Sequence, residues 1–439
     1  MGDGAAGMTA ARQLRHGDGA AEVVVVSDDP HPAYYRAALT NYLLGELRDE
    51  QLWATTPSFY AEYRVERVLA RANALVPERR ELWVSHGWPI VYDELLIATG
   101  ARARVLPFHG AAPRGVMTLR SLMDARAITE RLAERSVREA VIVGGGSLGL
   151  EWALGLHAHG VRVTLVVRGR TMLPGVLDQV SSDLLIARLR QAGVQVLLED
   201  EVVTPVGGRN AELVGAELRS GHTVPCQLLG LAIGIVPNVE FLKQSSIALG
   251  ASGGVVVNAA QRTSAPNVYA AGDVAEVAGG ILGLWEPAQR QAKVAAANML
   301  GQATSYEPGC HYLATRLFDL DFASVGKTGG QAHAGSGVVV DFPQGTGKIA
   351  YRKLVFDGPR LTGALMLGQR EERVRVHGRL FKRLIDSKVD VGAVASKLLD
   401  RSFDLRAWVA GQVVPAPSAA AAGEFRGAPA AGGFSHIKR

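Results

Sequence analysis

A glycine-rich loop near the middle of the chain constrains the fold more than any other feature. The segment VIVGGGSLGLE begins with β-branched residues and then places Gly144, Gly146 and Gly149 at the spacing G-x-G-x-x-G. A helical pattern follows, which predicts a strand, a tight turn and a helix in that order. Such a turn binds the pyrophosphate of a dinucleotide, because glycine lets the backbone approach the phosphate and the helix N-terminus carries free N–H groups.

A similar glycine loop lies at the start of the chain; in chain order it is the first loop, and the loop at Gly144 is the second. Gly2, Gly4 and Gly7 have the same spacing in GDGAAG, and the helical pattern AAGMTAARQLR follows them. Because each loop of this kind serves one pyrophosphate, the two copies predict two bound dinucleotides.

An acidic pair follows the strand that comes after the first loop. The apolar run EVVVVS is typical of a buried parallel strand, and Asp28 and Asp29 come directly after it. An acid about 20 residues beyond the glycines normally accepts hydrogen bonds from ribose hydroxyls. Two aspartates before Pro30 also suit a simple turn. The spacing favours ribose binding, and we favour Asp29 for this role.

The second loop lacks the corresponding acid. Its partner strand, VRVTLVV, ends at Val167 and is followed by Arg168, Gly169 and Arg170. Guanidinium groups supply bidentate donors for a 2′-phosphate and avoid the repulsion that a carboxylate would exert. The arginines are equally compatible with a charged surface loop. We interpret them as a preference for NADPH over NADH.

The composition indicates an enzyme of two or three domains. Of 439 residues, 48% are hydrophobic and 20% are charged, which suffices to bury several cores. No apolar run reaches the ~18 residues of a membrane span, and we find no signal peptide, so we expect a cytoplasmic protein. The formal charge of +5 is modest and argues against a nucleic-acid partner. Cys226 and Cys310 form no C-x-x-C pair, which excludes a dithiol site and favours two buried free thiols.

Five motifs in a fixed order resemble one family of flavoproteins. GDGAAG, YDELLIATG, VIVGGGSLGLE, AIGIVPN and APNVYAAGDVAE cover about residues 2–305 and resemble the FAD-dependent pyridine nucleotide oxidoreductases, which have two dinucleotide-binding domains. HPAYYRAALTNYL (31–43) and LATRLFDLDFASVGKT (313–328) are most similar to the flavin part of nitrite reductase large subunits and of rubredoxin and ferredoxin reductases. The resemblance implies FAD and NAD(P)H as cofactors, and Arg168 and Arg170 favour NADPH.

The resemblance also implies an α/β fold class. It comprises two Rossmann-like domains for FAD and NAD(P), of the three-layer ββα type, and a C-terminal α+β interface domain that covers the flavin. We expect an FAD-binding domain at residues 1–115 and 241–305, an NAD(P)-binding domain at 116–240, an interface domain at 306–410 and a disordered tail at 411–439. The family has a central strand before the first glycine, whereas Met1 directly precedes Gly2 here. We expect that strand to be encoded upstream; the alternative is a truncated protein that binds flavin poorly.

Individual roles follow from the same resemblance. The adenosine half of FAD would contact Gly2, Gly4, Gly7 and Asp29, and its adenine would contact the backbone of Val68. Arg36 would lie near the flavin, Asp273 would bind the ribitol, and Trp285 and Ala288 would lie beside the isoalloxazine. Thr99, Gly100 and Gly272 would belong to the same site. The nicotinamide nucleotide would contact Gly144, Gly146, Gly149, Glu151, Arg168, Arg170 and Gly234. We expect no catalytic acid or base, because the protein contributes positioning and electrostatics to a hydride transfer between the two cofactors.

The predicted function is an FAD-dependent NAD(P)H oxidoreductase that passes electrons through the flavin to an external acceptor such as a ferredoxin, a rubredoxin or a nitrite reductase-type partner. No cysteine lies beyond Cys310, so this chain alone does not reduce nitrite. The alternative is a flavin- or nucleotide-binding sensor or assembly subunit with little turnover. The intact second glycine loop favours the enzyme.

A basic cluster near the C-terminus has two interpretations. It is either the solvated face of a helix or a docking surface for a small acidic electron carrier. Its members are Arg370, Arg373, Arg375, Arg379, Lys382, Arg383 and Lys388. We expect a monomer or a homodimer. We expect no metal, because His157 and His159 are two residues apart on a helix and cannot face one ion.

Overall fold

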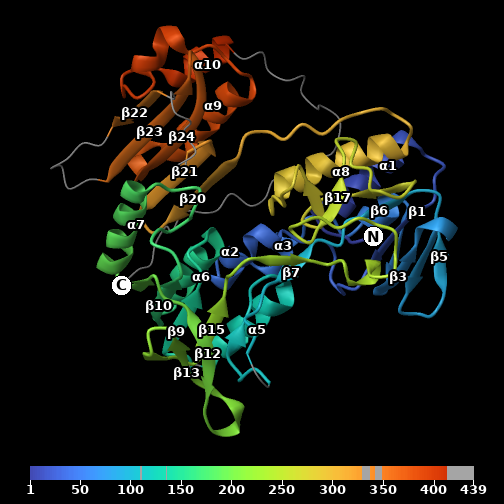
Figure 1. Ribbon diagram of the computed structural model, residues 1–439, viewed down its shortest axis with the longest axis horizontal. Helices are drawn as coiled ribbons and strands as arrows, with labels where there is room; N and C mark the ends of the chain where they lie inside the picture. Colours follow the sequence, from blue (N-terminus) through green and yellow to red (C-terminus); the bar gives the residue numbers. More distant parts are fainter. Residues whose placement is uncertain (109–110, 135, 329–336, 342–348, 413–439) are drawn as a thin grey trace.

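The chain forms an N-terminal, a middle and a C-terminal unit in the computed structural model, which describes residues 1–108, 111–134, 136–328, 337–341 and 349–412 (Figure 1). The N-terminal unit is built from two segments, one before and one after the middle unit. The N-terminal unit contains helices α1 (Ala5–Gly17), α2 (Leu39–Leu43), α3 (Asp49–Leu52), α4 (Phe59–Glu62) and α8 (Trp285–Met299). Its strands are β1 (Val23–Ser27), β2 (Val65–Leu69), β3 (Ala72–Val76), β4 (Glu81–Val84), β5 (Pro89–Val91), β6 (Leu95–Ile97), β7 (Ala101–Ala103), β17 (Val255–Val257), β18 (Val268–Ala270) and β19 (Ala275–Val277).

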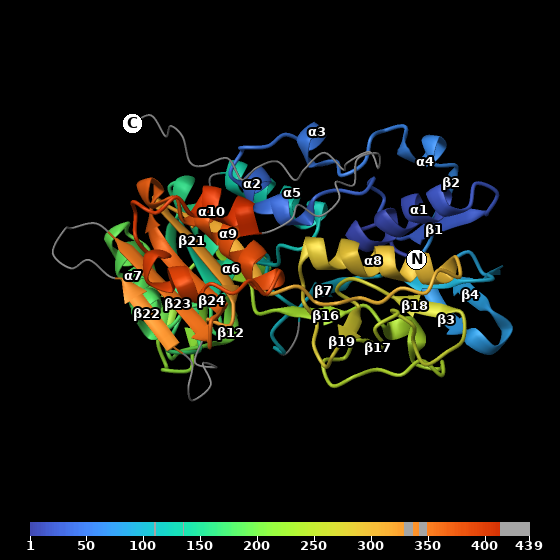
Figure 2. The same cartoon turned by 90° about the horizontal axis from the view of Figure 1, so that it is seen from above.

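Two parallel strand pairs and two helices form the centre of the N-terminal unit. Strand β1 pairs with β2, and β6 pairs with β18. Met1 and Gly2 lie between β1 and β6, because Gly2 N donates to Val26 O at 2.7 Å and Met1 N donates to Leu96 O at 2.9 Å. Helix α8 lies beside α1 (Figure 2). Their contact is lined with buried alanines, whose small side chains allow the two helices to approach closely.

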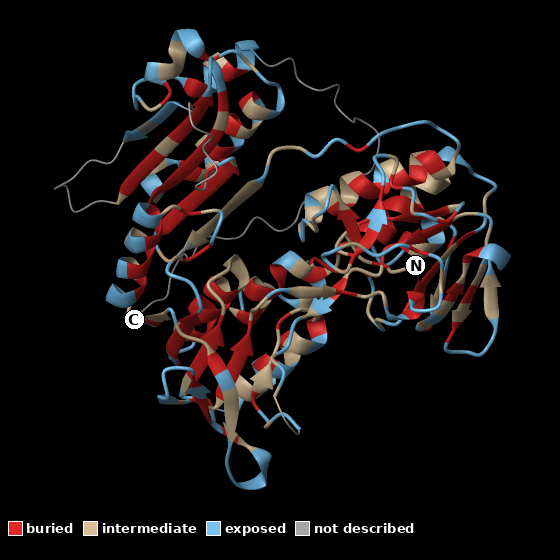
Figure 3. Cartoon of the chain, in the orientation of Figure 1, coloured by how far each residue is buried: buried red, intermediate tan, exposed pale blue. Residues whose placement is uncertain are grey.

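The middle unit is a parallel sheet with helices packed on it. Its strands are β8 (Val116–Met117), β9 (Glu139–Val143), β10 (Arg162–Val167), β11 (Gln195–Leu198), β12 (Val202–Gly207), β13 (Leu213–Leu218), β14 (Thr223–Pro225), β15 (Leu228–Leu231) and β16 (Ile235–Pro237), and its helices are α5 (Leu122–Ala133), α6 (Ser147–Ala158) and α7 (Gln179–Gln191). The sheet order is β11-β10-β9-β15-β8. Most of the β9 and β10 side chains are buried, as expected for parallel strands covered on both faces (Figure 3). Strands β7 and β16 pair where the chain crosses between the first two units.

The C-terminal unit is an antiparallel sheet with one helix-covered face. It contains β20 (Tyr312–Leu317), β21 (Leu320–Gly326), β22 (Gly337–Asp341), β23 (Ala350–Asp357), β24 (Arg360–Gln369), α9 (Val374–Asp386) and α10 (Leu405–Gln412). Side chains alternate between faces along a strand. Accordingly, Ala364 and Met366 of β24 share a core with α9, whereas Leu365 and Leu367 share a core with the middle unit.

One expected boundary, the start of the tail, changes in this part of the chain. Before it, the segment DVGAVASKLLD contains a 3₁₀ helix over Gly392–Lys397. Residues 411 and 412 end helix α10, and residues 413–439 of the expected tail lie outside the described part of the chain. Among the described helices, none has the length and apolar character that crossing a bilayer requires.

Asp178 joins the middle unit to the C-terminal sheet. It caps α7 by accepting a hydrogen bond from Ser181 N at 3.0 Å. The same carboxylate accepts from Tyr351 Oη at 2.5 Å and from Lys353 Nζ at 3.0 Å. Burial alone would raise the pKa of Asp178, but the hydrogen bonds from Tyr351 and Ser181 hold it below the usual value.

Replacing this carboxylate is expected to loosen the junction. Asp178→Ala removes a helix cap and two polar contacts between units, which should lower the free energy of unfolding by about 2 kcal/mol in urea denaturation at pH 7. Because the pKa of Asp178 is lowered in the folded state, its stabilisation is complete above the unfolded pKa and is lost as the pH falls through the folded pKa. The deficit should therefore shrink at acid pH. Asp183→Ala, at an exposed position of the same helix, is the control, and an equal loss in both variants would contradict this role.

Candidate functional site

The two glycine loops have the same local geometry. The first glycine of each loop has a positive φ, +93° at Gly2 and +122° at Gly144. A Cβ atom on Gly2 would lie 2.2 Å from Ala98 O, and one on Gly144 would lie 2.2 Å from Ala232 O. Only glycine therefore permits the strand end and its neighbour to lie this close.

The third glycine of each loop brings the helix onto the turn. A Cβ on Gly7 would lie 1.8 Å from Gly2 O, and a Cβ on Gly149 would lie 2.1 Å from Gly144 O. The second glycines differ, because no atom lies within 4 Å of the Cβ position of Gly4 or of Gly146. These glycines are the N-caps of α1 and α6, and neither helix has a side-chain cap. Each loop thus presents unpaired helix N–H groups to open space, which suits a pyrophosphate.

A cavity of about 740 Å³ opens at the first loop. It brings together six of the residues expected to bind FAD: Gly2, Gly4, Asp29, Arg36, Thr99 and Gly100. Sequence reasoning missed three arginines in its lining: Arg71, Arg102 and Arg120. Their signal in the sequence is weak, since each lies far along the chain from the glycines. Their positive charges suit a ligand that carries phosphates.

Asp29 is already engaged by neighbouring residues. Its carboxylate accepts hydrogen bonds from His31 N at 3.1 Å, from Tyr34 Oη at 3.1 Å and from Arg36 Nη2 at 3.5 Å. Asp28 also lines the cavity, and its side chain is 64% exposed, with Arg71 Nε at 3.8 Å. The structure therefore leaves the Asp28 carboxylate more accessible to a ribose, and binding by Asp29 stays a prediction.

Asp273, Gly272, Trp285 and Ala288, also expected at the flavin, are not among the residues that line this cavity, and Asp273 is linked to it through Arg120. Asp273 accepts a hydrogen bond from Arg120 Nη2 at 2.5 Å. Gly272 N donates to Gln291 Oε1 at 2.7 Å. The Ala288 methyl lies 3.6 Å from the position a Cβ on Gly272 would take, and the ring centroid of Trp285 is 5.1 Å from that of Tyr35.

Val68 itself does not line the cavity. It pairs with Val26 in the β1–β2 ladder, and Ala70 and Arg71, just beyond β2, line the cavity instead. Contact between the Val68 backbone and an adenine therefore stays a prediction.

The residues expected at the nicotinamide nucleotide gather at one edge of the middle sheet. Gly144 follows β9, Arg168 follows β10 and Gly234 lies beyond β15, and these three strands are parallel neighbours. Open α/β sheets bind ligands at the carboxyl ends of their strands. Arg170 Nε donates to Glu199 Oε1 at 2.7 Å, whereas no described residue pairs with the Arg168 side chain.

Glu151 connects all three units. From α6 of the middle unit, its carboxylate accepts hydrogen bonds at 3.2 Å from Thr40 of α2 and at 3.2 Å from Thr315 of β20. Burial raises the pKa of Glu151, and the two hydroxyls partly offset this effect. The carboxyl group fixes the relative position of α6 and the N-terminal unit, between which the two cofactors would meet.

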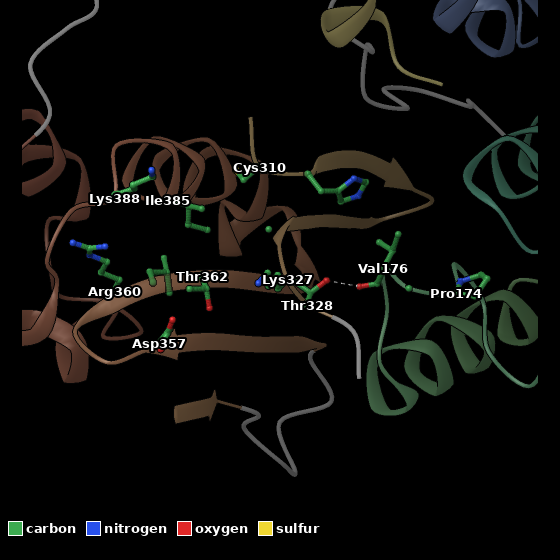
Figure 4. A pocket seen from close by; sticks show the side chains of 14 residues that line it. Pro174, Val176, Cys310, Lys327, Thr328, Asp357, Arg360, Thr362, Ile385 and Lys388 are labelled. Atoms are coloured by element: carbon green, nitrogen blue, oxygen red, sulfur yellow. Dashed lines mark hydrogen bonds between the residues drawn. The ribbon is translucent and has the colours of Figure 1, made fainter. Parts of the chain in front are cut away.

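A further cleft of about 780 Å³ lies between the middle and C-terminal units. Figure 4 shows Arg360 and Lys388 at one end and Val176 at the other, where Thr328 Oγ1 donates to Val176 O at 3.0 Å. No residue of either glycine loop lines this cleft, so it is separate from the dinucleotide sites.

Neither cysteine has the properties of a reactive thiol. Cys226 is buried and Cys310 is only half-buried, which corrects the expectation for Cys310, and both are free. Burial raises the pKa of each thiol to about 12. The protonated thiol is a poor nucleophile at neutral pH.

A family model described as pyridine nucleotide-disulphide oxidoreductase matches residues 1–292. The biphenyl dioxygenase system ferredoxin–NAD(+) reductase component of Paraburkholderia xenovorans (strain LB400) is 34% identical over 309 residues, covering 69% of this chain and 74% of that protein. The assimilatory nitrate reductase electron transfer subunit of Bacillus subtilis (strain 168) is 27% identical over 82% of this chain. The chain spans only 46% of that subunit, about half its length.

A solved structure with a similar fold is that of an NAD-dependent persulfide reductase from A. fulgidus. It superposes with a TM-score of 0.81 at 25% sequence identity, covering 90% of this chain and 77% of that one. The overall fold of this chain is therefore similar to that of a solved oxidoreductase.

Gly146 and Gly149 of the second loop are expected to respond differently to substitution, because only the Cβ position of Gly146 is open. Gly146→Val places methyl groups in open space where a pyrophosphate would lie, so the fold should persist while affinity for NADH and NADPH falls at least about tenfold, or about 1.4 kcal/mol. Gly149→Val drives a side chain into Gly144 O and should destabilise the protein. Calorimetric titration and thermal unfolding measure the two effects. Undiminished nucleotide binding by a folded Gly146→Val protein would show that the loop binds no dinucleotide.

Proposed function

The chain belongs to the pyridine nucleotide-disulphide oxidoreductase family, and from that premise we propose that it transfers electrons from NAD(P)H through bound FAD to an external acceptor protein. The observation that carries the proposal is the duplicated loop geometry, in which two uncapped helix N-termini face open space beside a glycine turn. One dinucleotide at each loop accounts for both.

The first loop and its cavity are proposed to hold FAD. Gly2 and Gly4 would admit the pyrophosphate, the aspartates after β1 would accept hydrogen bonds from the ribose, and Asp273, next to Arg120 of the cavity lining, would accept from the ribitol. Arg120 orients the Asp273 carboxylate. When bound, FAD would accept a hydride from the nicotinamide and release electrons one at a time. The protein residues bind and orient, and none of them has to transfer a proton.

The second loop is proposed to take NADPH in preference to NADH. The Arg168 side chain lies at the end of β10 without a partner among the described residues, so it is available to a 2′-phosphate. The preference for one nucleotide is not needed for the electron-transfer proposal, which holds for either donor.

The acceptor is proposed to be a small acidic electron carrier. The name of the biphenyl dioxygenase relative describes a reductase of ferredoxin, and that of the nitrate reductase relative an electron transfer subunit. In this chain, α9 buries Val374, Phe381 and Leu384 against the C-terminal sheet and exposes Arg379 and Arg383. Such a basic face would attract an acidic protein.

The visible spectrum of the FAD-loaded protein tests the first half-reaction. Under anaerobic conditions NADPH should bleach the flavin at lower concentration than NADH, and Arg168→Gln should raise the required NADPH concentration about tenfold by removing a charge-assisted contact with the 2′-phosphate. A protein that takes up no FAD, or a flavin that neither nucleotide bleaches, would rule out the proposal. Equal responses to both nucleotides would rule out only the NADPH preference.

Charge reversal on α9 tests the acceptor surface. Arg379→Glu combined with Arg383→Glu should raise the KM for a plant-type ferredoxin several-fold at low salt, and the difference should vanish as added salt screens the charges. Arg209→Glu, on an exposed turn of the middle unit, is the matched control. If both variants change the KM alike, α9 is merely a solvated helix face.

A further inference from the structure

Glu199 is attached to the loop that follows β10. It comes directly after β11, and its main-chain N donates to Gly169 O at 3.2 Å. The next residue, Asp200, donates from its N to Val167 O at 3.3 Å. These bonds hold Glu199 beside the position where a dinucleotide-binding strand usually carries its ribose-binding acid.

The conformation of Glu199 points to a specific role for its side chain. Its φ is +55°, a left-handed conformation that residues other than glycine, asparagine and aspartate seldom adopt. A strained backbone of this kind persists only where surrounding contacts enforce it. Here the contacts are the loop bond to Gly169 and the side-chain bond to Arg170 at 2.7 Å.

The pair between Arg170 and Glu199 is accessible to a ligand. The two side chains are 80% and 58% exposed. Exposed ion pairs contribute little to stability, so this one can exchange partners when a nucleotide arrives. The loop therefore presents one carboxylate, one arginine that the carboxylate holds, and Arg168 without a described partner.

We propose that Glu199 supplies the carboxylate missing from the end of β10 and sets the choice between NADH and NADPH. This inference rests on the proposed function of the second loop. With NADH, Glu199 accepts hydrogen bonds from the 2′- and 3′-hydroxyls of the adenosine ribose. With NADPH, the same carboxylate repels the 2′-phosphate and competes with it for Arg170. Arg168 and Glu199 thus act in opposite directions, and the site accepts both nucleotides.

The direct test uses adenosine fragments, whose binding requires no flavin. Calorimetry should show that Glu199→Gln binds adenosine 2′,5′-bisphosphate about three- to tenfold more tightly and 5′-AMP about threefold more weakly than the wild type, the range expected for one charge-assisted contact. Arg170→Gln should weaken only the bisphosphate. Glu217→Gln, at an exposed position on β13, is the matched control and should change neither affinity.

The same variants then give kinetic constants in the FAD-loaded protein with a dye acceptor. The ratio of kcat/KM for NADPH to that for NADH should rise about tenfold or more in Glu199→Gln. If Glu199→Gln shifts both fragments equally, or neither, the inference fails while the proposed function stands. If the wild type binds neither fragment and neither nucleotide bleaches the flavin, the proposed function fails as well.

Discussion

The close contact between the first and third glycines of each loop determines the geometry of both nucleotide sites. In each case a helix packs onto the carbonyl of the first glycine at a distance that leaves no room for a Cβ. That contact aims the helix axis at the strand end and keeps the helix N-terminus free of protein atoms. A side chain on the first or the third glycine would push the helix away from the turn and remove the anion site. Helix packing and anion binding therefore depend on the same contact between these two glycines.

The C-terminal sheet depends on a second kind of contact, made by carboxylates of the middle unit. Asp178 binds Tyr351 and Lys353, and Glu151 binds Thr315 as well as Thr40. These are directional polar bonds that accompany the apolar face formed by alternate residues of β24. Apolar burial supplies most of the attraction, but it is not directional; the carboxylates fix the register of one unit on the next.

Local patterns were enough to predict the elements, because the signals are short-range. A β-branched run, a glycine and a helical pattern specify a strand, a turn and a helix, and β1, β9, β10, α1 and α6 lie where their residues indicate. Contacts between distant segments carry no such signal. Arg120 reaches Asp273 across 153 positions, and Arg170 reaches Glu199 from another strand. The three hydrogen bonds that Asp29 accepts come from residues close to it in the sequence. They nevertheless depend on the irregular path of the chain after Pro30, which the hydrophobic periodicity of the sequence does not predict.

Two of the arginine–carboxylate pairs, one near each glycine loop, differ in exposure. Arg120, which lines the first cavity, and its partner Asp273 are 23% and 15% exposed, whereas at the second loop Arg170 and Glu199 are 80% and 58% exposed. A half-buried pair is little screened by water, and disrupting it leaves a charge without compensation, so it holds its geometry while a ligand stays in place. An exposed pair opens at little cost. The first arrangement suits a cofactor that remains bound through many turnovers. The second suits a nucleotide that must enter and leave at each turnover.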